Sequence, residues 1–287
     1  METITADGPR PKSGSLQSAG FYWRERDGVR VLICEPLEQA GFTNAFSTRL
    51  GGVSPMPQES LNLAGFNEDT AANIHENRRR FLKLLAGDWT LTSCWQVHGS
   101  AVRVVRSLAD ARNDTENCDA LTTCTAGILL GVKTADCVPL LVGDARTGAV
   151  AGIHAGWRGT VAGIVSQTLA RMKEEFGSRP EDLRVAIGPA ASGCCYEVGS
   201  EVVEAFLASF PALEHHLTPT REGHALIDLQ KANGELLVAA GVAPERIHLA
   251  PFCTMESTDL FFSYRQEKKV YGRVGRLMAV IGRAEIS

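Results

Sequence analysis

The sequence has few of the features that mark secreted, membrane or nucleic-acid-binding proteins. Its first 20 residues contain no apolar segment of the kind that a secretory signal needs. The apolar run 126–132 is too short to cross a bilayer and is soon followed by Lys133 and Asp136. A formal net charge of −4 provides no basic field for nucleic acid. We therefore expect a cytoplasmic protein with no membrane or nucleic-acid partner, and a flexible tail over residues 1–20.

The 8 cysteines lack the spacing of a closed structural zinc site. A Cys₄ site needs ligand pairs at short spacing, and the sequence contains no CxxC pair. Without a secretory signal these residues are expected to be reduced thiols, most of them small buried apolar groups. Cys194 and Cys195 are neighbours, and neighbours in an extended chain point to opposite sides. We therefore do not expect them to bind one ion together.

Apolar periodicity predicts alternating strands and helices along a chain of 287 residues. Apolar residues alternate on both sides of Asp27-Gly28 and predict a β-hairpin. Further strands are predicted at 42–48, 128–132, 138–142, 149–154, 183–187, 247–250 and 277–281, and helices at 69–85, 160–176, 202–210 and 230–240. The short turn at 144–148 requires antiparallel pairing of its flanking strands. We predict an α+β fold, one domain over residues 21–287 with mixed, mainly antiparallel sheets flanked by helices.

Three side chains near the ends of predicted strands form a candidate metal-binding set. They are His98, Cys137 and His154. One thiolate and two imidazoles suit zinc, with copper as a second candidate. Three protein ligands leave one coordination position open, which is the arrangement of catalytic sites. Asp136, beside Cys137, is a candidate to orient a ligand or act as a general base, because an unpaired carboxylate would be costly in a core.

A second group of residues has the chemistry of substrate binding. Arg158 stands between glycines before a predicted helix, where backbone N–H groups and a guanidinium favour an anion. Arg49 precedes Gly51-Gly52 and is a second anion candidate, and Asn62 can hydrogen-bond a sugar hydroxyl or a base edge. Tyr264 and Arg265 end an aromatic run that can stack on a planar base. For each segment a purely structural role, as a tight turn or as core packing, remains open.

Seven segments, in order from about residue 40 to residue 275, resemble those of the YfiH family, also called the polyphenol oxidoreductase laccase family. They are Phe46-Ser47-Thr48-Arg49 with Gly51-Gly52, Ser60-Leu61-Asn62-Leu63, Gln96-Val97-His98-Gly99, Thr134-Ala135-Asp136-Cys137, His154-Ala155-Gly156-Trp157-Arg158-Gly159, Gly193-Cys194-Cys195-Tyr196-Glu197-Val198 and Phe261-Phe262-Ser263-Tyr264-Arg265. Several motifs in the same order are far more specific than any single one.

The resemblance implies a single αββα-type domain with a catalytic zinc held by His98, Cys137 and His154. It also implies purine nucleoside phosphorylase activity on adenosine, inosine and 5′-methylthioadenosine, with adenosine deaminase activity beside it. The expected partners are then a small nucleoside and phosphate, bound by a monomer or a small homo-oligomer. Arg49 and Arg158 are our candidates to hold the phosphate, and Asp136 and Glu197 to move a proton.

Three other functions compete with this one. The first is a cysteine hydrolase with Cys137 as nucleophile and His154 as base. The second is a copper-dependent polyphenol oxidase, for which the remaining histidines, His75, His215, His216, His224 and His248, look too dispersed to complete a copper cluster. The third is a binding module without catalytic activity, in which the open metal position would have no purpose.

Overall fold

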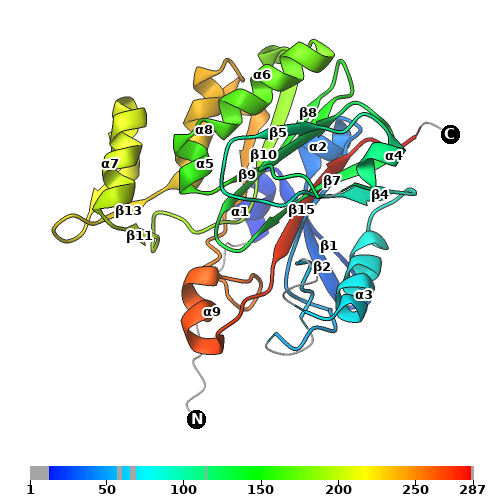
Figure 1. Ribbon diagram of the computed structural model, residues 1–287, viewed down its shortest axis with the longest axis horizontal. Coiled ribbons are helices and arrows are strands. Elements are labelled where there is room, and N and C mark those ends of the chain that lie inside the picture. The colour runs from blue at the N-terminus through cyan, green and yellow to red at the C-terminus, as the bar shows by residue number, and fades with distance from the viewer. Residues whose placement is uncertain (1–12, 57–59, 65–68, 114, 286–287) are drawn as a thin grey trace.

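The computed structural model describes residues 13–56, 60–64, 69–113 and 115–285, and within them two six-stranded sheets pack face to face (Figure 1). The first sheet has the order β1 (Phe21–Arg26), β2 (Val29–Cys34), β3 (Thr43–Ser47), β15 (Leu277–Gly282), β7 (Ile128–Thr134), β4 (Thr90–Thr92). The second has the order β14 (Ile247–Leu249), β10 (Leu183–Ile187), β8 (Val138–Asp144), β9 (Val150–Ala155), β6 (Ala120–Thr123), β5 (Val102–Val104). A small third sheet contains β11 (Glu197–Val198), β13 (Ala225–Ile227) and β12 (Leu217–Pro219).

Helices flank the two sheets. They are α1 (Ser13–Ser18), α2 (Glu35–Gln39), α3 (Ala71–Leu82), α4 (Leu108–Ala111), α5 (Trp157–Val161), α6 (Ile164–Phe176), α7 (Ser200–Ser209), α8 (Leu229–Ala239) and α9 (Tyr264–Tyr271), with 3₁₀ turns at Pro180–Asp182, Pro211–His216 and Pro244–Arg246. Helix α3 packs on the first sheet through Phe81, and α6 and α8 pack on the second. This helix–sheet–sheet–helix layering confirms the predicted α+β class. None of the helices in the described residues is both long and apolar enough to cross a bilayer.

The layers follow from the alternation of apolar side chains along the strands. In β2, Val31 and Ile33 face α3, whereas Leu32 faces the second sheet. In β8, Leu140 belongs to the core beneath the helices and Leu141 to the core between the sheets. These two central strands thus bury apolar groups on both faces, at about 1.5–3 kcal/mol per large side chain.

Most strand pairs are antiparallel, and the exceptions are β4–β7, β5–β6 and β10–β14. The predicted hairpin is present: β1 and β2 pair with Arg26 opposite Val29. Asp27 and Gly28 between them both have positive φ, 51° and 77°, as a two-residue hairpin turn with the right twist requires.

The sheet membership of β7 was not predictable from the sequence. Strands β8 and β9 pair antiparallel, as the turn at 144–148 predicted. Strand β7, however, lies in the first sheet, so residues 135–137 cross from one sheet to the other. Both strands are apolar on two faces, and such a run does not indicate which neighbour it pairs with. The crossing places Cys137 between the two sheets.

Two other predictions need correction. The helix predicted at 160–176 is two helices, α5 and α6, because Gly163 adopts a left-handed conformation with φ of 76°. Residues 1–12 of the predicted tail lie outside the described residues, but Ser13–Ser18 form α1, with Leu16 buried in the core. The tail therefore does not extend to residue 20.

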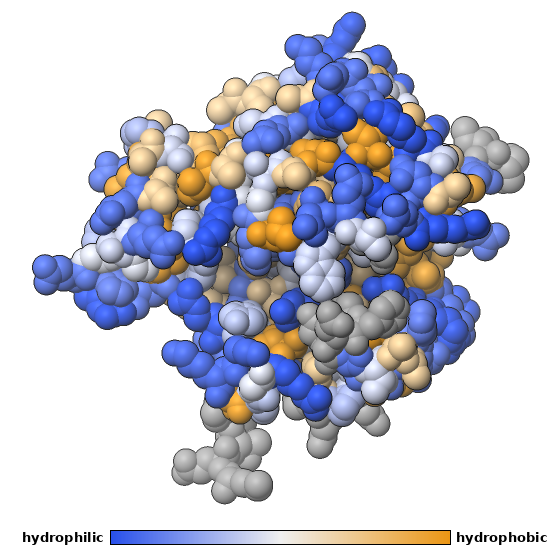
Figure 2. Space-filling model, viewed as in Figure 1, coloured by the Kyte–Doolittle hydropathy of each residue, from blue (hydrophilic) through white to orange (hydrophobic). Residues whose placement is uncertain are grey.

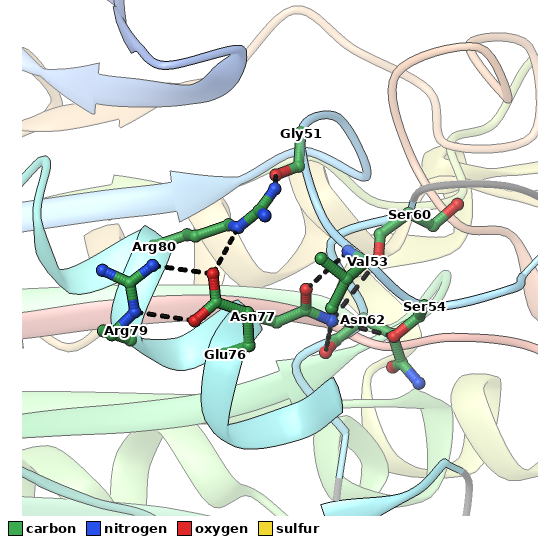
Figure 3. Close-up of polar contacts among 9 residues, drawn as sticks. All are labelled: Gly51, Val53, Ser54, Ser60, Asn62, Glu76, Asn77, Arg79 and Arg80. Atoms are coloured by element: carbon green, nitrogen blue, oxygen red, sulfur yellow. Dashed lines mark hydrogen bonds and ion pairs between the residues drawn. The ribbon is translucent and has the colours of Figure 1, made fainter. Parts of the chain in front are cut away.

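Helix α3 also holds the segment that follows β3. Val53 N–H donates to Asn77 Oδ1, and Asn77 Nδ2 donates to Ser54 Oγ and to the carbonyl of Asn62 (Figure 3). Arg79 and Arg80 pair with Glu76 on the same helix.

Candidate metal centre and active site

The fold brings together the three proposed metal ligands. His98 precedes β5, Cys137 lies in the crossing between β7 and β8, and His154 lies in β9. One ligand atom from each residue lies within 4.8 Å of the other two. The two imidazole rings meet edge to face, with centroids 4.9 Å apart. Residues separated by up to 56 positions in the sequence (98 to 154) therefore converge on one point.

Asp119, at the start of β6, orients both histidines. Its Oδ1 lies 2.8 Å from His154 Nδ1 and accepts the backbone N–H of His98 at 3.0 Å. Its Oδ2 accepts the N–H of Gly99 at 2.7 Å. Because Asp119 hydrogen-bonds Nδ1 of His154, Nε2 of that ring is left to bind an ion. The hydrogen bonds from the His98 and Gly99 N–H groups hold His98 at a positive φ of 59°.

Asp119 was not among the site residues predicted from the sequence. The carboxylate is fully buried, and burial would raise its pKa, but hydrogen bonds from His154 and from the Gly99 N–H lower it below the ordinary value. The signal was present in the sequence. An acidic residue immediately before a buried strand needs a hydrogen-bond partner, because a buried carboxylate without one is costly. The same reasoning led us to Asp136.

Asp119→Asn is expected to weaken metal binding by about 10–100-fold. The asparagine NH₂ group would face one of the backbone N–H donors now satisfied by a carboxylate oxygen, so the His98 loop would shift. Titration of the metal-free variant with zinc measures the effect. Asp110→Asn is a control, because Asp110 pairs with Arg103 outside the ligand set. Equal affinity of Asp119→Asn and the parent protein would contradict the orienting role.

The surroundings of Cys137 favour the thiolate form of its side chain. Burial alone would raise its pKa, but the charge of His154 and hydrogen bonds from His154 and His98 lower it to about 6. Burial would lower the pKa of His154, yet the neighbouring thiolate and Asp119 raise it to about 9. A thiolate at neutral pH is the form that binds a metal or attacks an electrophile.

The backbone leaves space for an ion at this point. A Cβ atom added to Gly156 would lie 2.9 Å from His98 Nδ1 and 3.0 Å from Cys137 Sγ. Such contacts are too close for a carbon atom, so only glycine keeps the ligand atoms accessible. The donor set and this open position fit a zinc or copper ion.

The three ligands line a cavity of about 590 Å³. It is lined by Trp95, Gln96, His98, Lys133, Thr134, Ala135, Asp136, Cys137, His154, Trp157, Arg158, Tyr196, Tyr264, Arg265 and Arg276. The face of the molecule shown in Figure 2 is hollowed near its centre, between the positions of α5 and α9 in Figure 1, and both hydrophilic and hydrophobic side chains border the hollow. A cavity of this size accommodates a ligand of nucleoside dimensions.

The lining combines positive charge with aromatic surface. Lys133, Arg158, Arg265 and Arg276 contribute four cationic side chains, against one carboxylate, Asp136, among the described lining residues. The predicted substrate residues Arg158, Tyr264 and Arg265 are thus in the cavity. Arg276 is a further lining residue that the sequence did not indicate. Tyr264 and Trp95 are about half exposed at the cavity.

Asp136 lines the cavity, but both its oxygens are already hydrogen-bonded. Oδ1 accepts from the Thr254 hydroxyl at 2.6 Å, and Oδ2 accepts from the Ser263 hydroxyl at 3.0 Å and the Arg265 N–H at 2.7 Å. These bonds connect the sheet crossing to the start of α9. The placement is that of a positioning residue rather than of the general base that we considered. Glu197, the other proton candidate, is paired with Arg221 and is not a lining residue.

Arg49 and Asn62 lie away from the cavity. The Arg49 guanidinium pairs with Glu267 at 2.8 Å and also donates to the carbonyls of Thr258 and Met56. Asn62 is fully buried, and its Oδ1 accepts the backbone N–H groups of Ala64 and Arg276. Both side chains make their hydrogen bonds within the protein interior. The structure therefore does not bring Arg49 and Asn62 to the cavity, where we expected them to contact the substrate.

Comparison with known proteins agrees with this architecture. The family model described as "Multi-copper polyphenol oxidoreductase laccase" matches residues 43–284. Purine nucleoside phosphorylase YlmD of Geobacillus stearothermophilus is 37% identical over 267 residues, covering 88% of this chain and 94% of the relative. A purine nucleoside phosphorylase of Deinococcus radiodurans is 40% identical over 242 residues, covering 83% and 88%.

Solved structures show the same fold. The crystal structure of YlmD from Geobacillus stearothermophilus superposes with a TM-score of 0.84 at 34% identity, covering 93% of this chain and 99% of that one. The Bacillus licheniformis hypothetical protein YfiH superposes with a TM-score of 0.83 at 29% identity, covering 91% and 98%.

Proposed function

The chain belongs to the multi-copper polyphenol oxidoreductase laccase family, and from this premise we propose that it is a metal-dependent purine nucleoside phosphorylase. The observation that carries the proposal is a cationic, aromatic-lined cavity whose lining includes the converging side chains of His98, Cys137 and His154. Zinc is the proposed metal. The proposed nucleosides are adenosine, inosine and 5′-methylthioadenosine, with deamination of adenosine as a second activity.

The cavity lining offers arginines for the phosphate and aromatic rings for the purine. Arg158, Arg265 and Arg276 line the cavity and would bind a phosphate dianion, which guanidinium groups recognise through paired hydrogen bonds. Trp157 and Tyr264 offer aromatic faces for a purine. Each face is shared with an arginine, since Arg158 stacks on Trp157 at 4.1 Å and Arg276 lies 5.9 Å from the Tyr264 ring. Base and phosphate would thus bind side by side.

In phosphorolysis, a phosphate oxygen forms a bond to ribose C1′ while the bond from C1′ to the purine nitrogen breaks. The arginines would hold the phosphate against the sugar, and such positioning alone supplies several kcal/mol of a barrier. A zinc ion held by His98, Cys137 and His154 would supply Lewis acidity. Asp119 keeps the two histidines in place, and Asp136 keeps the start of α9, with Arg265, against the cavity.

The proposal is tested by incubating the purified protein with adenosine, with and without phosphate. Adenine and ribose 1-phosphate should appear only when phosphate is present. Inosine produced in its absence would report the deaminase activity separately. Failure to form ribose 1-phosphate from adenosine, inosine and 5′-methylthioadenosine alike would reject the phosphorylase assignment.

Arg158→Gln is expected to raise the KM for phosphate by about 10–100-fold, as the loss of a hydrogen bond to a charged group does. Arg158 is more than half exposed, and its pair with Glu201, at 3.3 Å, is long. Its replacement should therefore cost little stability. Steady-state kinetics at varied phosphate measure the effect, and Arg171→Gln, which replaces a partly exposed, ion-paired arginine on α6, is the control. An unchanged KM would remove Arg158 from the phosphate site.

A cysteine hydrolase remains the second candidate because of one specific arrangement. Cys137 contacts His154, and His154 is bound in turn to Asp119, which is the order of nucleophile, base and orienting carboxylate. The copper oxidase has less support. Among the described residues, the cavity lining holds no histidine besides His98 and His154 with which to complete a copper cluster.

Alkylation of Cys137 separates the metalloenzyme from the hydrolase. In metal-free protein the thiol pKa of about 6 keeps Cys137 a thiolate at pH 8, and its rate of reaction with iodoacetamide should fall through a midpoint near pH 6 as pH is lowered. Peptide mass spectrometry follows the modification, with the exposed Cys124 as reference. Bound zinc should protect Cys137 in the phosphorylase. Full activity in a metal-free protein, lost on alkylation, would instead indicate the hydrolase.

A further inference from the structure

A second cluster of potential metal ligands lies outside the active-site cavity. It consists of Cys194, Cys195 and Cys253, which we call the three-thiol cluster. Cys195 Sγ lies 3.1 Å from Cys194 Sγ and 3.2 Å from Cys253 Sγ. All three sulfurs lie within 4.8 Å of one another, and all three cysteines are free thiols.

The convergence contradicts our expectation that Cys194 and Cys195 point apart. That expectation assumed an extended chain, but the segment is a turn in which the N–H groups of Cys195 and Tyr196 both donate to the carbonyl of Ser192. Cys253 reaches it from a distant segment, held by a β-bridge to Ala190. Two independent backbone features therefore present three sulfurs to one point.

The spacing of the sulfurs suits a metal ion. Zinc–sulfur bonds of about 2.3 Å place two tetrahedral ligands about 3.8 Å apart. The two short contacts, at 3.1 and 3.2 Å, need only small outward rotations to reach that separation. Thiolates select zinc and copper(I) over magnesium or calcium.

The cluster is also accessible and offers a fourth ligand. Cys194 and Cys253 line a cavity of about 430 Å³ that is separate from the active-site cavity, and Glu256 lines it beside them. Glu256 is exposed and lies within hydrogen-bonding reach of the Cys194 thiol. An ion can enter from solvent and complete its shell with this carboxylate or with water.

We propose that Cys194, Cys195 and Cys253 form a second, structural site for a thiophilic d¹⁰ cation, zinc or copper(I), with Glu256 as the fourth ligand. The ion would tie the turn at 192–196 to the segment around Cys253. Tyr196, next to Cys195, lines the active-site cavity, and Thr254, next to Cys253, hydrogen-bonds Asp136. An ion bound to the three-thiol cluster would thus stabilise one side of the active-site cavity.

The test uses the full chain carrying Cys137→Ala, which removes the first site. Reduced protein is titrated with zinc and, separately, with copper(I), and bound metal is counted by native mass spectrometry. One ion per chain is expected. Adding Cys194→Ser or Cys253→Ser should weaken its binding by more than about 100-fold, since even outer partners of a metal ligand contribute about 10–100-fold.

Matched variants keep the test decisive. Cys124→Ser removes an exposed thiol outside both clusters and should leave the affinity unchanged. Because Cys194 is exposed, Cys194→Ser should still fold and measure the contribution of the cluster to metal affinity, even if Cys253→Ser impairs folding. The relative affinities of the two titrations identify the cation. No bound ion in Cys137→Ala, or an ion insensitive to Cys194→Ser, would overturn the proposal, as would formation of a Cys195–Cys253 disulfide by protein that takes up no metal.

Discussion

Cys137→Ala is expected to abolish metal binding at the active site and to lower kcat/KM for adenosine phosphorolysis by roughly 10³-fold or more. A bound metal supplies several kcal/mol of charge stabilisation, and about 4 kcal/mol corresponds to roughly 10³ in rate. The remaining ligands, His98 and His154, would be two imidazoles without the thiolate that holds the cation. Metal content by mass spectrometry and steady-state kinetics measure the two losses together.

The control for this variant is Cys124→Ala, which removes an exposed thiol that belongs to neither ligand set. It should keep both metal and activity. If Cys137→Ala kept its active-site metal, the ligand assignment would be wrong. If it lost the metal but kept phosphorolysis, the cavity would act through its arginines alone.

Arg49→Met is expected to destabilise the fold by about 3–5 kcal/mol, because it leaves a buried carboxylate without its partner. The Arg49 and Glu267 side chains are only 10% and 9% exposed and lie 2.8 Å apart. The guanidinium also stacks on Phe262, 4.5 Å from the ring centroid. Urea unfolding, monitored by circular dichroism, measures the loss. Arg79→Met is the matched control, since its pair with Glu76 is solvent-exposed and should contribute little to stability.

A double variant distinguishes a structural from a substrate-binding role for Arg49. Arg49→Met with Glu267→Leu removes both buried charges and should recover much of the lost stability. It should also recover activity, because α9, which carries Glu267 and Arg265, would again be anchored. A phosphate KM that stays raised in a stable double variant would return Arg49 to the substrate site.

The elements that the sequence predicts correctly are those set by local residue patterns. The β1–β2 hairpin follows from Asp27-Gly28, and the predicted strands at 128–132, 138–142 and 149–154 are present because burial imposes a period on neighbouring residues. Two predictions were wrong where the backbone departs locally from a regular conformation. Gly163 splits a continuous apolar pattern into α5 and α6, and the turn at 192–196 brings the side chains of Cys194 and Cys195 to the same side of the chain.

The sequence by itself therefore determined the fold class, most strands and helices, and which side chains have the chemistry of metal and anion binding, because residue type and periodicity are local properties. Only the tertiary structure decided how those side chains are used. The crossing between the sheets positions Cys137 near His98 and His154, and packing places Arg49 in the core but Arg276 in the cavity. The partner of a side chain depends on which distant segments pack together, and no local pattern encodes that.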